Sequence, residues 1–108
     1  MAHYIITYIG GQQPSNPEEG QKHFAKYQEW LGSLGDAVVS PMNPLKDTSV
    51  IQPNGEVVPG SLTEMSGFTL LDVDSMQIAI ELARSCPFLE IGGSLEVSEL
   101  MQGWKSPK

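Results

Sequence analysis

The chain has 108 residues, which is about the length of one domain. Six Lys and Arg against 13 Asp and Glu give a formal net charge of −7 at pH 7, which argues against nucleic acid and anionic membranes as partners, because both bind clustered basic residues. Hydrophobic residues make up 40% and charged residues 18%, so the chain has enough apolar side chains for a core.

Cysteine and histidine are scarce. The single cysteine, Cys86, excludes an intramolecular disulfide and a cysteine-based zinc site, and no spacing of carboxylates with His3 or His23 supports a metal site. We therefore expect no cofactor and assign Cys86 a packing role.

Residues 1–9 lack the basic start of a signal peptide, and no stretch is long enough to span a bilayer. A cytoplasmic protein is the expectation.

The first predicted elements are a strand and a helix. Residues 4–9 are all β-branched or aromatic and are followed by Gly10, which predicts a buried strand. Asn16 and Pro17 are typical of a helix start and Gly35 of a helix end. Between these ends the apolar residues recur at helical spacing: Phe24, Tyr27, Leu31 and Leu34, with Trp30 beside them.

A short strand and a hairpin come next. Residues 37–39 predict a strand that is ended by the prolines of segment 41–44. Residues 48–52 and 56–58 flank Pro53-Asn54-Gly55, which predicts a hairpin with a primed Asn-Gly turn.

The last third repeats the strand–helix–strand order. After a loop at residues 59–66 we expect a strand at 68–73, a helix capped at Asp74-Ser75 and ended by Pro87, and a strand at 94–100. The second helix has an apolar stripe of Ile78, Ala79, Leu82, Ala83 and Cys86.

This order predicts an α+β fold, a ferredoxin-like βαββαβ framework with an extra β-hairpin and an antiparallel sheet that carries two helices on one face. The predicted domain covers residues 1–101, followed by a short tail at 102–108. Both sides of the first strand are apolar, since Tyr4, Ile6 and Tyr8 alternate with Ile5, Thr7 and Ile9. Two helices cover only one face, so the other face predicts a partner, most simply a second copy with two-fold symmetry.

Several segments together resemble the YCII-related (DGPF-type) domain family. They are residues 4–11, Ser66-Gly67-Phe68, residues 74–87 and residues 89–97, and the resemblance covers residues 2–101. It implies a ferredoxin-like fold whose dimers form an α+β barrel, with a small organic ligand in the cavity between the two sheets and no bound cofactor. Some family members are linked to dehydrochlorinase chemistry.

The chain departs from the family pattern at two places. Where relatives carry Asp-Gly-Pro-Phe, it reads Val-Pro-Gly-Ser-Leu at residues 58–62, and Glu64 is placed to take the acidic position of that motif. Some relatives resemble enzymes with a His–Asp dyad on the first helix. His23 matches the histidine, whereas the place of the aspartate is taken by residues 32–34, and Asp36 lies just beyond Gly35.

The candidate site residues each have a structural alternative. His23 is the candidate for proton transfer, and the alternative is a helix-flank histidine bonded to Glu19. Glu96 shares a strand face with two serines and is a base or ligand clamp, or else fixes strand register. The remaining candidates for ligand binding are Tyr4, Tyr8 and Glu64, with core packing as the alternative for the tyrosines.

Two functions follow from these residues. The first is a cofactor-free enzyme or binder of small molecules, of the proton-abstraction or elimination type, with its site in the inter-sheet cavity of the dimer. The alternative is a non-catalytic dimeric interaction or accessory module. The missing Asp-Gly-Pro-Phe segment and the missing dyad aspartate favour this alternative.

Overall fold

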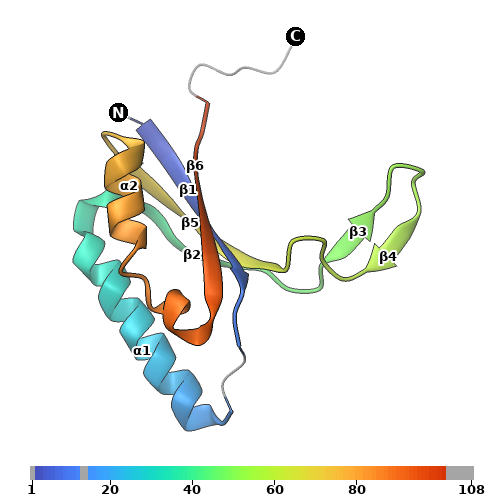
Figure 1. The fold of residues 1–108 in the computed structure, drawn as a ribbon, viewed down its shortest axis with the longest axis horizontal. Coiled ribbons are helices and arrows are strands. Elements are labelled where there is room, and N and C mark those ends of the chain that lie inside the picture. Colours follow the sequence, from blue (N-terminus) through green and yellow to red (C-terminus); the bar gives the residue numbers. More distant parts are fainter. Residues whose placement is uncertain (1, 13–14, 102–108) are drawn as a thin grey trace.

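A four-stranded antiparallel sheet carries two helices on one face and a separate hairpin at one end (Figure 1). The computed structural model describes residues 2–12 and 15–101, so the predicted tail at 102–108 lies outside the described residues. The elements are β1 (Ala2–Gly10), α1 (Pro17–Leu34), the 3₁₀ turn η1 (Gly35–Ala37), β2 (Val38–Pro44), β3 (Ser49–Ile51), β4 (Val57–Pro59), β5 (Met65–Val73), α2 (Met76–Ala83), the 3₁₀ turn η2 (Pro87–Ile91) and β6 (Gly93–Glu99).

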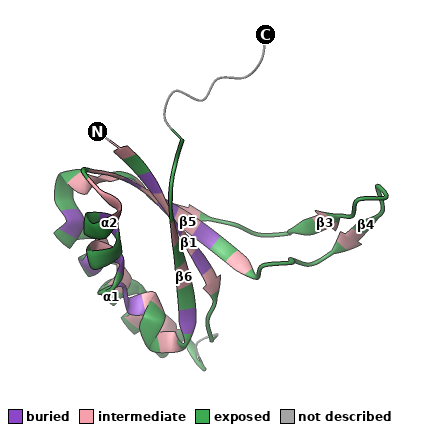
Figure 2. Cartoon of the chain, turned by 45° about the horizontal axis from the view of Figure 1, so that its top comes forward, coloured by how far each residue is buried: buried purple, intermediate pink, exposed green. Residues whose placement is uncertain are grey.

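The strand order of the large sheet is β2-β5-β1-β6, and β3 pairs only with β4. The predicted α+β class with two helices and an antiparallel sheet is therefore confirmed, and this architecture is consistent with a ferredoxin-like fold. Both helices lie on the same side of the sheet in the two views (Figures 1 and 2).

The core lies between the helices and alternate residues of the central strands. Tyr4, Ile6 and Tyr8 of β1 are at most 5% exposed, whereas the residues between them are only half-buried. In β5, Thr69 and Leu71 are fully buried in the same way. The period of two that the sequence shows in its first strand thus separates a helix-covered face from an open face.

The helix ends form as their sequences predict. The Asn16 side chain accepts a hydrogen bond of 2.9 Å from the N–H of Glu19, and Gly35 ends α1 with a positive φ of 57°. Trp30 is buried and donates its indole N–H to the carbonyl of Leu82 at 3.1 Å, which ties α1 to α2. The apolar stripe is incomplete toward the start of α1, where Phe24 is 45% exposed.

The second helix is shorter than predicted. The Ser75 side chain accepts the N–H of Ile78 at 3.2 Å, so the predicted cap forms. The helix ends at Ala83, before Pro87, which instead begins η2. Proline has no N–H to give but favours the first position of a helical turn, and it therefore starts this turn as readily as it would stop a helix.

The predicted end of the second strand is wrong. Ala37 belongs to η1, and β2 begins at Val38 and continues through both prolines to Pro44. The strand lies at the edge of the sheet, and its pairing with β5 shifts register between Ser40 and Asn43. An edge strand with an irregular ladder tolerates proline, because the missing N–H is not needed for pairing.

The predicted hairpin is confirmed, but its turn type differs. The arm formed by residues 45–64 projects from the end of the sheet and carries β3 and β4 (Figure 1). Gly55 has a φ of 90° and donates its N–H to the Gln52 carbonyl at 2.8 Å, whereas the non-glycine residues with positive φ among the described ones are Asp47 and Glu64. A primed turn needs positive φ at Asn54 as well, so this is a longer turn that closes on Gly55.

Among the described residues, neither α1 nor α2 combines the length and the apolar composition that crossing a bilayer requires.

A leucine truncation tests the position of the core. Leu71→Ala should lower the free energy of unfolding by about 2–5 kcal/mol, because the side chain is fully buried between sheet and helices. Leu100→Ala, the same change at a side chain that is 41% exposed, should cost distinctly less. Chemical denaturation of both variants measures the difference, and equal losses would contradict the assigned core.

Candidate functional site

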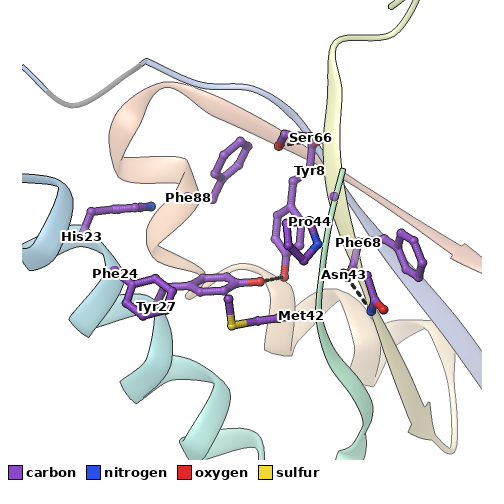
Figure 3. A pocket seen from close by; sticks show the side chains of 11 residues that line it. Tyr8, His23, Phe24, Tyr27, Met42, Asn43, Pro44, Ser66, Phe68 and Phe88 are labelled. Atoms are coloured by element: carbon purple, nitrogen blue, oxygen red, sulfur yellow. Dashed lines mark hydrogen bonds between the residues drawn. The ribbon is translucent and has the colours of Figure 1, made fainter. Parts of the chain in front are cut away.

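A cavity of about 160 Å³ lies between the first half of α1, η2 and the ends of β2 and β5 from which the arm leaves (Figure 3). Its walls are mainly apolar and include Phe24, Met42, Pro44 and Phe88. Three of its polar groups come from Tyr8, His23 and Tyr27. The volume matches a small ring system, because a cavity of about 150 Å³ holds benzene in another protein.

Three hydroxyl groups form a chain at the inner end of this pocket. The Tyr27 hydroxyl donates to the Tyr8 hydroxyl at 2.8 Å, and the Tyr8 hydroxyl lies 2.5 Å from Oγ1 of Thr69. Thr69 in turn donates to the carbonyl of Pro41 at 2.7 Å. The chain therefore crosses from α1 through β1 and β5 to the edge strand β2, and it satisfies a fully buried threonine.

The Tyr8 phenol stays neutral. Burial raises the pKa of Tyr8 well above its ordinary value, because the loss of hydration disfavours the phenolate. The pocket consequently has a polar but uncharged inner end.

The aromatic wall of the pocket consists of Tyr8, Tyr27 and Phe88, and the Phe88 ring packs closely against two glycines. The ring of Tyr8 meets Tyr27 and Phe88 edge-to-face, with ring centroids 5.7 and 5.4 Å apart. A Cβ on Gly93 would lie 2.2 Å from the Phe88 ring, and one on Gly11 would lie 2.9 Å from it. Glycine at both positions leaves the space that this ring occupies, which accounts for one residue of each Gly-Gly pair in the sequence.

His23 lies in the pocket wall, four residues before Tyr27 on the same side of α1 (Figure 3). Its imidazole is half-buried, and no carboxylate among the described residues lines this pocket. Asp36 lies beyond the far end of the helix, about 20 Å along its axis from His23. A His–Asp pair within one chain is therefore not formed by these two residues.

The structure separates the other predicted site residues from His23 and Tyr8. Tyr4 is buried at the opposite end of β1, where burial and the charge of Glu99 raise its pKa. Glu96 is exposed on the open face of the sheet, opposite Thr7, as its position in the strand predicts. Glu64 is exposed in the loop before β5, where its carbonyl accepts the N–H of Gly10 at 3.1 Å.

Sequence reasoning missed Tyr27, Thr69 and Phe88. Tyr27 was assigned to the core stripe, although its position one helical turn after His23 places it on the same side of the helix. Thr69 is a polar residue on the buried side of an apolar strand, and such a residue needs a hydrogen-bond partner. Phe88 carried no comparable signal, because its position depends on the turn after α2.

Metal ligands and relatives give no further assignment. No three His, Cys, Asp or Glu side chains in the described part of the chain come together as a metal site. No protein-family model and no curated protein matches this sequence.

The buried thiol of Cys86 predicts an alkaline loss of stability. Burial raises its pKa from 9.0 to about 11 in the folded chain, so between these pH values the unfolded chain binds fewer protons than the folded one. The free energy of unfolding should fall as pH rises through this range, by about 3 kcal/mol at most from this group.

Urea denaturation at pH 8, 9 and 10 measures the slope. Cys86→Ala should be less stable at pH 8, because it leaves a cavity, but should show a shallower decline with pH. An identical slope in the variant would mean that the thiol of the folded chain ionises as it does in the unfolded chain.

Proposed function

We propose that this chain binds a small organic molecule in the pocket beside α1 and that it belongs to the YCII-related family. The observation that carries the binding proposal is a cavity with aromatic walls that holds an imidazole and a chain of neutral hydroxyls. Ligand sites commonly combine apolar walls with a few convergent polar groups. The family assignment rests on the sequence resemblance and is supported by the order of strands in the sheet.

In the catalytic form of this proposal, His23 is the base. Imidazole is a side chain that commonly transfers protons in enzymes, and the position of His23 in the wall allows contact with a molecule in the cavity. The reaction would be a proton abstraction or an elimination, in which the imidazole takes a proton from carbon and the electron pair goes to a carbonyl group or expels a leaving group. Tyr8 belongs to the pocket through its hydroxyl, whereas Tyr4, Glu64 and Glu96 lie elsewhere.

The alternative is a non-catalytic interaction or accessory module. A base is stronger and better oriented when a carboxylate accepts the other imidazole N–H. Within the described residues no carboxylate lines the His23 pocket, which favours this alternative over an efficient enzyme.

We further propose that two copies associate through the open face of the sheet, as a dimeric α+β barrel. Ile5, Phe68 and Leu70 lie on this face and are only half-buried. Asp72 is on the same face, and its Oδ1 is buried with no hydrogen-bond partner among the described residues. A second copy would cover the apolar residues, offer a donor to this carboxylate, and create the inter-sheet cavity into which Glu96 would point.

The projecting arm supports this dimer. Its outer part, residues 48–63, carries a single charged side chain, that of Glu56, whereas Lys46, Asp47 and Glu64 lie at its base. Both sides of the ribbon are apolar. Val50 pairs with Val58 on one side. On the other side Ile51, which is 72% exposed, pairs with Val57, which is 61% exposed. An isolated two-stranded ribbon is marginally stable in water. A second copy of the chain is the simplest partner that would bury its exposed apolar side chains. The radius of gyration, 15.7 Å, exceeds the value of about 13 Å expected for a compact chain of this length.

Isotope exchange tests the catalytic form. The wild-type protein should accelerate the exchange of the benzylic protons of 4-hydroxyphenylacetone in D₂O, and His23→Gln should lower this rate by about 10²-fold or more. Nuclear magnetic resonance of the probe measures the rate. His3→Gln is the matched control, because His3 is exposed on β1 outside the pocket. Equal rates in His23→Gln and wild type would contradict the role of His23 and leave the binding proposal standing.

Sedimentation tests the dimer. The wild-type protein should sediment as a dimer at micromolar concentration, and Leu70→Glu on the open face or the pair Ile51→Ser and Val57→Ser on the arm should each yield monomers. Ile78→Ser is the control, because Ile78 is 43% exposed on α2, which packs on the other face of the sheet. A wild-type monomer would contradict the dimer, and an arm variant that remains dimeric would remove the arm from the interface.

A further inference from the structure

The hydroxyl chain beside the pocket has a fixed direction. Each of its hydroxyl groups has one proton to donate, and the Pro41 carbonyl at its end has none. Thr69 therefore gives its proton to Pro41, at 2.7 Å. The contact of 2.5 Å between Tyr8 and Thr69 then needs the proton of Tyr8, which leaves Tyr27 as the donor to Tyr8 at 2.8 Å.

The irregular edge strand β2 supplies the Pro41 carbonyl at which the hydroxyl chain ends. Between Ser40 and Asn43 the pairing of β2 with β5 shifts register, and Pro41 lies inside that interval. Its carbonyl is consequently available to a side chain rather than to a ladder hydrogen bond. The direction of the hydroxyl chain is thus set by the backbone and not by the protonation of a nearby charged group.

At the pocket end of the hydroxyl chain, the Tyr27 oxygen is a hydrogen-bond acceptor. The proton of Tyr27 is directed inward, toward Tyr8 or toward Thr69 at 3.5 Å, so its oxygen presents only lone pairs to the cavity. The amide of Asn43, which also lines the cavity, donates to Ser40 and to the Phe68 carbonyl. Ser66 Oγ, a further polar group of the wall, donates to the Tyr8 carbonyl at 3.4 Å, so its oxygen also presents only lone pairs. Tyr27 and His23 are then the main polar side chains of the wall left to meet a ligand.

We propose that the Tyr27 end of the pocket selects neutral ligands of about one aromatic ring that carry an O–H or N–H donor, and that it discriminates there against ligands that offer only acceptors. This proposal rests on the proposed binding function and adds the ligand class. A donor on the ligand completes the hydrogen bonding of Tyr27, whereas a carboxylate or an ether oxygen would face the Tyr27 oxygen without a proton between them.

A pair of probes of similar size tests the preference. Phenol carries a donor, and fluorobenzene has the same ring without one. Nuclear magnetic resonance titration of the wild-type protein should show phenol binding about three- to tenfold more tightly, which is the range for one neutral hydrogen bond. Equal affinities would overturn the donor preference but leave the binding function intact. If neither probe shifts the resonances of residues around the cavity, the proposed binding function fails as well.

Removal of the Thr69 hydroxyl should reverse the direction of the hydroxyl chain, because it cuts the link to the Pro41 carbonyl. In Thr69→Val the Tyr8 proton loses its acceptor and turns to Tyr27, whose own proton then faces the cavity. The preference for phenol should disappear, and benzonitrile, an acceptor, should bind more tightly than it does to the wild type. Thr7→Val is the matched control, because Thr7 lies on the open face, opposite Glu96, and should leave the preference unchanged.

A second variant tests the proposal even if Thr69→Val does not fold. Tyr27→Phe removes the acceptor itself, so phenol should weaken to the affinity of fluorobenzene while fluorobenzene is unaffected. Persistence of the wild-type preference in a folded Thr69→Val, or in Tyr27→Phe, would overturn the assigned direction of the chain.

Discussion

The arrangement of this molecule depends on one constraint: two helices cover one face of a four-stranded sheet and leave the other face open. Alternate residues of a strand point to opposite faces, so this cover assigns every strand side chain to one of two environments. Tyr8 and Thr69 lie on the covered side, where burial compels their hydroxyls to pair with each other. Ile5 and Leu70 lie on the open side. The pocket and the proposed dimer surface are therefore two consequences of the same alternation.

Local sequence chemistry predicted most of the fold. The run of β-branched and aromatic residues in β1, the Asn16 cap and the Gly35 stop of α1 act within a few residues, and the structure confirms each of them. The course of β2 was not predictable in the same way. Pro41 normally ends a strand, and it is tolerated here because β2 lies at the edge and shifts its register, which are properties of the assembled sheet rather than of the segment.

The candidate site was only partly visible in the sequence. Alternation correctly placed Tyr4 and Tyr8 on one face, but it carries no information about position along the strand. Four residues of strand separate these tyrosines by about 13 Å, so only Tyr8 reaches the cavity. His23 was found through the family resemblance. Its neighbours in the cavity come from β2 and η2, and their approach is set by packing over long sequence separations.

The position of Phe88 divides the cavity into fixed and adjustable walls. Its ring fills the notch at Gly11 and Gly93, where the end of β1 meets the start of β6, and Gln12 donates its N–H to the Ile91 carbonyl at 2.8 Å beside it. This wall is tied to the register of the central strands, and a larger residue at Gly93 would collide with it. Phe24 and Met42, 45% and 39% exposed, have no such neighbours on one side. Variation of cavity size among homologues would accordingly be concentrated at these two positions, with the aromatic wall and its glycine notch held constant.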